Sequence, residues 1–288
     1  FLTCGSVDDG KSTLIGRLLY DAGLVPEDQW ASVVRLSAQR GQTGELPDYS
    51  LLLDGLLDER AQGITIDVAW RYFQTPRCKF ILGDAPGHEQ YTRNMATGAS
   101  QCDLALILLD ARKGILPQTR RHTAIVRLMG IRRVVVVVNK MDLVGWDELA
   151  FIELQRDFLA FTKPLGVSDP VFIPVSALRG DNVVHRSEHM PWYAGPPVLE
   201  YLEGVEIDGH SITAPMRFPV QYVTRTGDFR GYSGSVAAGT IRLDDAVIVL
   251  PSGVRSRVSS IVTFDGELPQ ASAGQSVTVT LRDNVDVT

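Results

Sequence analysis

A phosphate-loop pattern near the start of the chain constrains its fold more than any other feature. The run Gly5–Ser12 reads G-x-x-x-x-G-K-S, follows the apolar stretch Phe1–Cys4 and precedes apolar residues at helical spacing. In a strand–loop–helix context the glycines let backbone N–H groups curl around phosphate oxygens, and the helix N-terminus adds partial positive charge. The pattern therefore predicts an α/β fold that binds a nucleoside triphosphate, and by itself it does not name the base.

Each position of this loop has an expected role. Lys11 is expected to reach the β- and γ-phosphates, and the Ser12 hydroxyl is expected to bind Mg²⁺. The residues predicted to bind phosphate are Gly5, Ser6, Val7, Asp8, Asp9, Gly10, Lys11, Ser12 and Thr13, together with Gly87 from a later loop.

The base is indicated by the run Asn139–Asp142, which follows the predicted strand Val134–Asn139. An aspartate here accepts hydrogen bonds from guanine N1–H and the N2 amino group, both of which adenine lacks. Two charge-assisted bonds of about 1.5–3 kcal/mol each favour guanine by roughly 10²–10⁴-fold. Ser176–Leu178 follow the next strand and are expected to offer backbone N–H groups to guanine O6. The predicted guanine-binding residues are Asn139, Lys140, Asp142, Ser176, Ala177 and Leu178.

Two further runs have the pattern of segments that sense the γ-phosphate. In Asp84–His88, Asp84 is expected to hold Mg²⁺ through water, and the Gly87 N–H to meet the γ-phosphate. His88 is the candidate catalytic residue, because it can position the attacking water. Thr65 can place its hydroxyl on Mg²⁺ only when the triphosphate is present, so Gly23–Gly63 before it is interpreted as a switch with helical parts. The predicted metal ligands are Ser12, Thr65 and Asp84.

The alternation of apolar strands with helical segments predicts the fold class. The first two thirds favour an α/β domain with a mostly parallel sheet and helices on both faces. From Ala214 onward short β-rich runs separated by turns predict a small all-β barrel. We expect the domains to span 1–205 and 206–288. The expected strands are Phe1–Cys4, Ile66–Tyr72, Lys79–Gly83, Leu104–Asp110, Val134–Asn139, Val171–Val175, Phe218–Tyr222, Gly231–Ala237, Ala246–Val249, Arg257–Thr263 and Ser276–Leu281.

Composition excludes several classes of protein. The chain has 288 residues and is 44% hydrophobic, which fits a globular protein rather than a disordered one. No apolar run approaches the roughly 20 residues that cross a bilayer. The net charge of −6 argues against nucleic-acid binding, and three widely spaced cysteines favour a reducing cytoplasm over a disulfide framework. The first and last residues suggest a fragment of a longer protein.

The ordered set GSVDDGKS, GITI, DAPGH, NKMD and SAL, followed by a β-barrel, resembles the translation-factor class of GTPases, to which elongation factor Tu and elongation factor 1-alpha belong. The residues between these motifs are similar to one family within that class, the large GTP-binding subunits of bacterial sulfate adenylyltransferase. Asp9 separates the two, because elongation factors usually have His there. The runs that carry the closer resemblance are Asp8–Asp21, Gln62–Ala69, Arg71–Phe73, Pro86–Ser100 and Phe229–Tyr232.

The resemblance implies a GTPase that requires GTP and Mg²⁺ and couples hydrolysis to the formation of adenosine 5′-phosphosulfate and pyrophosphate from ATP and sulfate. It implies a smaller catalytic subunit as partner, in a heterodimer or a larger assembly, with neither nucleic acid nor membrane. It also implies a second barrel beyond residue 288 and, in some members, a fused adenylylsulfate kinase domain outside this chain.

Three other functions stay open at the level of sequence. One is a carrier that delivers aminoacyl-tRNA, which Asp9 and the acidic charge disfavour. A second is a phosphotransferase that uses ATP, which Asn139–Asp142 opposes. The third is a GTP-regulated scaffold without a coupled reaction.

Overall fold

The computed structural model describes residues 1–40, 46–53, 65, 67–167, 169–206, 213–226, 229–264 and 266–285. The chain forms two compact units, Phe1–Val205 and Glu206–Thr288. The helices of the larger unit, including short 3₁₀ helices labelled η, are α1 (Lys11–Asp21), α2 (Glu27–Arg40), η1 (Tyr49–Leu52), η2 (Glu89–Tyr91), α4 (Thr92–Ala99), α5 (Pro117–Leu128), η3 (Met141–Val144), α6 (Glu148–Thr162), η4 (Lys163–Leu165) and α7 (Val198–Gly204).

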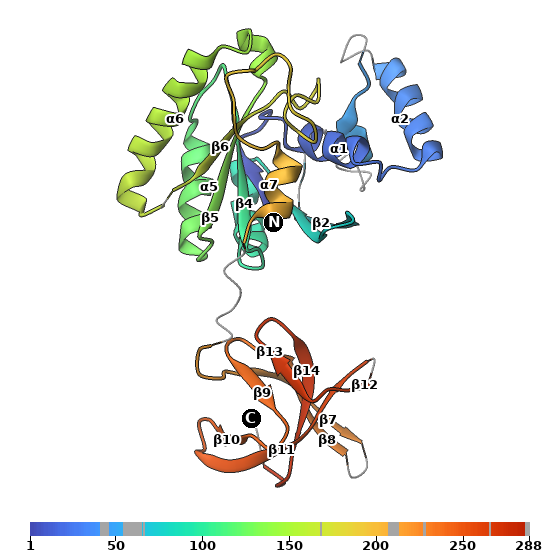
Figure 1. The fold of residues 1–288 in the computed structure, drawn as a ribbon, viewed down its shortest axis with the longest axis vertical. Coiled ribbons are helices and arrows are strands. Elements are labelled where there is room, and N and C mark those ends of the chain that lie inside the picture. The colour runs from blue at the N-terminus through green and yellow to red at the C-terminus, as the bar shows by residue number, and fades with distance from the viewer. Residues whose placement is uncertain are drawn as a thin grey trace. The chain divides into compact units, whose positions relative to one another are not determined.

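The larger unit is built on a six-stranded sheet in the order β2-β3-β1-β4-β5-β6 (Figure 1). Five of its strands are parallel, and β2 runs antiparallel to β3 at the edge. The predicted mostly parallel sheet is confirmed. The strands are β1 (Leu2–Gly5), β2 (Ala69–Gln74), β3 (Lys79–Asp84), β4 (Leu104–Asp110), β5 (Arg133–Asn139) and β6 (Val171–Pro174).

Helices cover both faces of this sheet, and alternate residues of the central strand belong to two separate cores. Ala105, Ile107 and Leu109 pack with side chains of α4, α5 and α6. Their neighbours Leu104, Leu106 and Leu108 pack with α1 and α7. Every residue of β4 is buried, and each buried aliphatic side chain contributes about 1.5–3 kcal/mol relative to exposure. The unbroken apolar run in the sequence is therefore explained by two-sided burial.

One strand of the sheet begins three residues later than its prediction, whereas the bounds of the other strands differ by at most one residue. The strand expected over Ile66–Tyr72 begins at Ala69 and continues to Gln74. Just before it, the Asp67 carboxylate accepts a hydrogen bond from the backbone N–H of Val68, a local bond that competes with strand pairing. Ile66 itself lies outside the described residues.

The segment interpreted as a switch contains a 14-residue helix, α2, and the short helix η1. Trp30 of α2 stacks on Tyr49 of η1 at 5.4 Å between ring centroids, and Tyr20 of α1 lies 4.0 Å from Trp30. A Cβ on Gly16 would lie 2.0 Å from the Tyr49 carbonyl oxygen, so only glycine allows this close approach of η1 to α1. Residues 41–45 and 54–64 lie outside the described part of the chain.

The smaller unit is all β, as predicted, with antiparallel pairing throughout its described strands. One sheet has the order β10-β11-β14-β8-β7 with β12 beside β11, and β13 pairs with β9. Its core contains Val236, Ile241, Val258, Ile261 and Val279. The strands are β7 (Val220–Thr226), β8 (Phe229–Ser235), β9 (Thr240–Arg242), β10 (Ala246–Val249), β11 (Val254–Thr263), β12 (Gly266–Glu267), β13 (Gln270–Ser272) and β14 (Ser276–Leu281).

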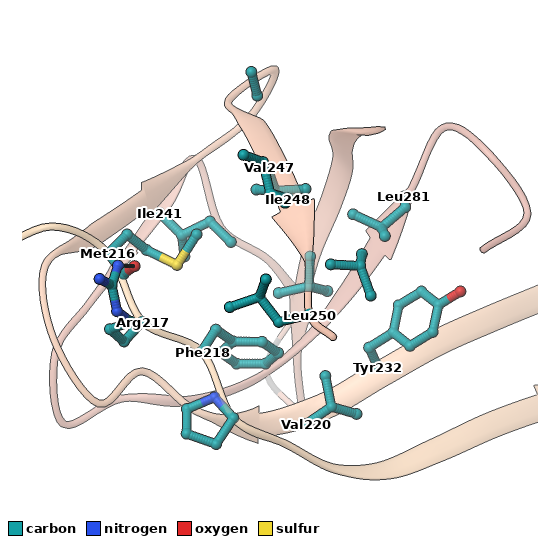
Figure 2. A pocket seen from close by; sticks show the side chains of 14 residues that line it. Met216, Arg217, Phe218, Val220, Tyr232, Ile241, Val247, Ile248, Leu250 and Leu281 are labelled. Atoms are coloured by element: carbon teal, nitrogen blue, oxygen red, sulfur yellow. Dashed lines mark hydrogen bonds between the residues drawn. The ribbon is translucent and has the colours of Figure 1, made fainter. Parts of the chain in front are cut away.

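Sequence patterns placed β7 too early, over Phe218–Tyr222, whereas pairing begins at Val220. Pro219 explains the shift, since proline has no N–H to donate to a ladder. An apolar cavity of about 750 Å³ lies against the core of this unit. Figure 2 shows Phe218, Val220 and Tyr232 around it. No helix among the described residues is both long enough and apolar enough to cross a membrane.

Candidate functional site

The carboxyl ends of the parallel strands bring the predicted site loops to one edge of the sheet. The phosphate loop follows β1, Asp84 ends β3, and Asn139 ends β5. Asp110, at the end of β4, stands opposite Asn139 in the strand register. Ser176 follows β6 at the same edge. Open parallel sheets bind ligands at this edge, so the topology itself assembles the candidate site.

The phosphate loop is shaped by residues in the left-handed backbone conformation. Gly10 has φ +88°, and a Cβ there would lie 2.4 Å from the side-chain nitrogen of Asn139. Asp8 has φ 64°, a conformation in which Asp is among the few tolerated non-glycine residues. The ammonium of Lys11 donates to the Ser6 carbonyl at 2.8 Å and approaches the Gly5 carbonyl at 3.4 Å. The lysine thus lies folded over its own loop.

A cavity of about 180 Å³ opens over this loop. Gly5, Ser6 and Asp9, which the sequence also assigned to phosphate binding, are not part of its lining. Thr65, Gly87 and His88 come to the cavity from the two predicted γ-phosphate segments, whereas Gly63, Ile64 and Ile66 lie outside the described residues. Ser50 of η1 also lines the cavity, which no sequence pattern predicted. The lining residues are Val7, Asp8, Gly10, Lys11, Ser12, Thr13, Ser50, Thr65, Gly87 and His88.

Lys11 is a buried cation held among carboxylates. Burial lowers the pKa of Lys11, while Asp84 and then Asp9 oppose that shift. Asp84 is itself buried and accepts a hydrogen bond from the Thr3 hydroxyl at 2.9 Å. Because Lys11 is 7% exposed and lines the cavity, its charge is little screened by water. This arrangement attracts an anion.

Gly87 and His88 follow β3 in the chain and line the cavity. A Cβ on Gly87 would lie 2.6 Å from the Lys11 ammonium and 3.1 Å from the Val7 backbone nitrogen. Glycine is therefore the residue that leaves room at this point. His88 lines the cavity, precedes η2 and lies edge-on to Tyr91 at 6.5 Å between ring centroids.

The Asn139 side chain links two loops of the site. Its Nδ2 donates to the Asp9 carbonyl at 2.8 Å, and its Oδ1 accepts from the Ala177 N–H at 2.9 Å and from the Lys140 N–H at 2.8 Å. Asn139 is 2% exposed. The Ala177 N–H, one of the amides expected to face guanine O6, is thus already bonded to protein. Asn139 thus holds the phosphate loop and the base loop in place.

Asp142 is held in place and keeps free capacity to accept hydrogen bonds. The Ser176 hydroxyl donates to its Oδ1 at 2.7 Å, and Arg179 approaches its Oδ2 at 3.9 Å. A carboxylate has about four acceptor positions, so these contacts leave room for further donors. The carbonyl of Leu178 accepts a hydrogen bond from Arg17 of α1 at 3.1 Å, which ties the loop after β6 to the helix after the phosphate loop.

Sequence reasoning missed two buried residues behind the loops. The Asp110 carboxylate, 0% exposed, accepts from Arg112 at 2.8 Å and pairs with Lys140 at 3.0 Å. These hydrogen bonds hold the Asp110 pKa below its usual range despite burial. Lys140 also donates to the Asp8 carbonyl, so Asp110 fixes Lys140 over the phosphate loop.

His122 of α5 is the second buried residue that the sequence patterns did not identify. Its Nδ1 accepts the Gly5 N–H at 3.1 Å, and its side chain is 0% exposed. Burial, aided by the positive charges of Lys11 and Arg121, lowers the His122 pKa to about 4. The neutral ring thus anchors the first glycine of the loop. In the sequence, the only sign of this role is that His122 is a polar residue on the sheet-facing side of a helix.

The donor set of the site fits a magnesium ion that arrives with phosphates. Among the described residues no three or more His, Cys, Asp or Glu side chains are arranged to hold a metal ion. Ser12 and Thr65 line the cavity, and Asp84 acts on Lys11 beside it. Magnesium usually keeps several waters and takes one or two protein oxygens plus substrate phosphates, which this set can supply.

Comparison with known proteins identifies the family to which this chain is similar and several of its relatives. The model of the elongation factor Tu GTP-binding domain matches residues 1–217. Sulfate adenylyltransferase subunit 1 of Shewanella oneidensis is 58% identical over 100% of this chain and 59% of its own length. The same-named protein of Laribacter hongkongensis is 58% identical, with 60% of its length covered. The chain thus spans about three fifths of these curated relatives.

Among solved structures, Sup35 in complex with GDP is 26% identical with a TM-score of 0.54, and the match covers 98% of this chain and 63% of that chain. Its fold agrees with the α/β unit and β unit described above.

The depressed pKa of His122 predicts a pH dependence of stability. The unfolded chain binds a proton at this histidine below pH 6.5, whereas the folded chain binds it only near pH 4. The neutral ring therefore stabilises the fold fully above pH 6.5, and this contribution is lost as pH falls toward 4. Urea denaturation should show the wild type losing about 3 kcal/mol more than His122→Gln across this interval. Parallel profiles would contradict the assignment.

Proposed function

Because this chain belongs to the family of elongation factor Tu GTP-binding domains, we propose that its carboxyl-edge site binds and hydrolyses GTP, and that hydrolysis drives sulfate activation. The supporting observation is that the phosphate loop and both γ-phosphate segments line one cavity. Asn139 joins the base loops to that phosphate loop, in a chain 58% identical along its whole length to a sulfate adenylyltransferase subunit 1. We assign 1–205 to the GTP-binding domain and 206–288 to a translation-factor-type second domain.

The phosphates bind over the loop that lines the cavity. Lys11, Ser12 and Thr13 at the start of α1 line this space, so we assign their backbone N–H groups as donors to the phosphates. Lys11 exchanges its loop carbonyls, those of Gly5 and Ser6, for phosphate oxygens. Gly87 offers its N–H to the γ-phosphate. Ser12, Thr65 and, through water, Asp84 would hold Mg²⁺, which would supply positive charge to stabilise the phosphate oxygens.

The guanine base is recognised by Asp142 and the loop after β6. Ser176 fixes the carboxylate by its hydrogen bond to Oδ1, and the remaining acceptor positions take guanine N1–H and N2–H. Since the Ala177 N–H is bonded to Asn139, we assign contact with guanine O6 to the Leu178 N–H. Lys140, stretched between the Asp8 carbonyl and Asp110, lies between the base and phosphate loops.

Hydrolysis needs no covalent attachment to the protein. His88 lies at the cavity and positions the water that attacks the γ-phosphate. Lys11 stabilises the charge that develops on the phosphate oxygens, so catalysis consists of orientation and electrostatic stabilisation. Loss of the γ-phosphate removes the contacts of Gly87 and Thr65, and the segments that carry them relax.

The coupled reaction is the formation of adenosine 5′-phosphosulfate and pyrophosphate from ATP and sulfate, which is uphill without an energy source. We propose that a separate smaller subunit performs adenylyl transfer and that the γ-phosphate segments of this chain drive its conformational change. Delivery of aminoacyl-tRNA is not favoured, because the relatives at 58% identity are sulfate adenylyltransferase subunits.

Replacing Asp142 tests base recognition. Asp142→Asn exchanges an acceptor for an amide N–H donor, which suits the O2 carbonyl of xanthine and repels the guanine N2 amine. We expect GTP affinity to fall by roughly 10²-fold and xanthosine triphosphate to become the better ligand, measured by competition against a fluorescent nucleotide. Unchanged preference for GTP would remove Asp142 from the base site.

Replacing His88 tests the catalytic assignment. His88→Ala leaves the phosphate loop and the base loops intact, so GTP affinity should stay within about twofold. Single-turnover hydrolysis should slow by roughly 10²–10⁴-fold, the usual contribution of a positioned acid–base group. Wild-type turnover in this variant would exclude His88 from the mechanism.

The coupled function is tested with the full-length protein and its candidate small subunit. Pyrophosphate release from ATP and sulfate should rise strongly when GTP is added and should not rise with a non-hydrolysable GTP analogue. The His88→Ala protein is the matched control, since it should bind GTP without supporting the rise. Equal release with and without GTP would contradict coupling.

A further inference from the structure

A buried carboxylate lies beneath the phosphate loop, at Asp9. Its side chain is 1% exposed, and its Oδ2 accepts the Ser6 backbone N–H at 2.7 Å. The loop leaves space for it at Gly5, where a Cβ would lie 3.1 Å from Oδ2 and φ is +146°. The side chain therefore reaches back across the turn and is held inside it, away from the cavity lining.

The second oxygen of this carboxylate is unsatisfied. Asp9 Oδ1 is buried and has no hydrogen-bond partner among the described residues. A buried acceptor without a donor destabilises the charged form of its group. Burial is accordingly the main cause that raises the Asp9 pKa from 3.8 to about 6. At pH 7 Asp9 is still mostly ionised, so a negative charge persists inside the loop.

Three charged side chains from three different elements act on the Asp9 carboxylate. Lys11 at the start of α1 and Lys140 after β5 attract it, and Asp110 at the end of β4 repels it. His122 of α5, which binds the same loop at Gly5, stays neutral above a pKa of about 4. Lys11 is the main attractive partner, and it is also the cation that the triphosphate needs.

We propose that the Asp9 carboxylate is a negative charge built beneath the phosphate loop that weakens nucleotide binding and speeds nucleotide release. The inference rests on the proposed GTP site. The phosphates and Asp9 lie on opposite faces of one short loop and compete for Lys11, and like charges in a poorly solvated interior repel one another. Protonation of Asp9 relieves the repulsion, so nucleotide binding favours proton uptake.

Neutralising Asp9 without removing its acceptor tests the proposal. Asp9→Asn keeps a carbonyl oxygen for the Ser6 N–H and removes the charge. In stopped-flow displacement of a fluorescent GDP analogue at pH 7.5, this variant should release nucleotide about tenfold more slowly than the wild type, with affinity raised accordingly. Asp157→Asn, on the exposed surface of α6, removes the same charge elsewhere and should keep the wild-type rate.

The pH profile separates a charge effect from a structural one. Wild-type release should slow as pH falls from 8 to about 5.5 and approach the Asp9→Asn rate, whereas titration of the nucleotide affects both proteins alike. A constant ratio of rates across this range, or release from Asp9→Asn as fast as from the wild type, would overturn the proposal. Failure of the wild type to bind GDP would instead refute the proposed GTP site.

Titration calorimetry gives an independent readout. At pH 7.5, in two buffers of different ionisation enthalpy, the wild type should take up more protons on binding GDP than Asp9→Asn, because titration of GDP and of Lys11 is common to both proteins. Equal proton uptake would overturn the role of Asp9, and Asp9→Ser is the second neutral variant should Asp9→Asn not fold.

Discussion

The amide of Asn139 is the contact on which the rest of the site depends. It joins the end of β5 to the phosphate loop through the Asp9 carbonyl and to the base loop through the Ala177 N–H. These bonds are shielded from water, so they are stronger than surface hydrogen bonds would be. The spacing between the phosphate and base subsites is thereby set by one short, buried side chain, and Gly10 is required to leave room for it.

Two groups of charged side chains lie around Asn139, and both contact the phosphate loop. Lys11 lies among Asp84 and Asp9, and Lys140 is tied to Asp110 and to the Asp8 carbonyl. Lys140 is thus oriented before any ligand arrives, which lowers the cost of reorganisation on binding. Lys11, in contrast, exchanges the Gly5 and Ser6 carbonyls for phosphate. The same carboxylates limit how strongly the cations attract phosphate, so preorganisation and affinity are balanced against each other.

Patterns in the sequence predicted those elements whose residues are close together in the chain. The phosphate loop, the buried strand Leu104–Asp110 and the helices on both faces all follow from spacing and hydrophobicity. The partners inside the site did not follow from the sequence: the Asp9 carboxylate accepts the Ser6 N–H within the loop, and the Ala177 N–H donates to Asn139. Such partners are distant in sequence, so only the folded backbone brings them together. His122, 117 residues from Gly5, belongs to the same class.

One nucleotide is expected to contact the phosphate loop and the guanine-binding loops at once. Hydrogen–deuterium exchange of this chain with saturating GTP and Mg²⁺ tests it directly. The backbone amides of Gly10–Thr13 and of Leu178 should gain protection with GTP, and the amide of Leu178 should not gain it with ATP. Protection confined to the phosphate loop, or equal protection by ATP, would contradict the proposed guanine site.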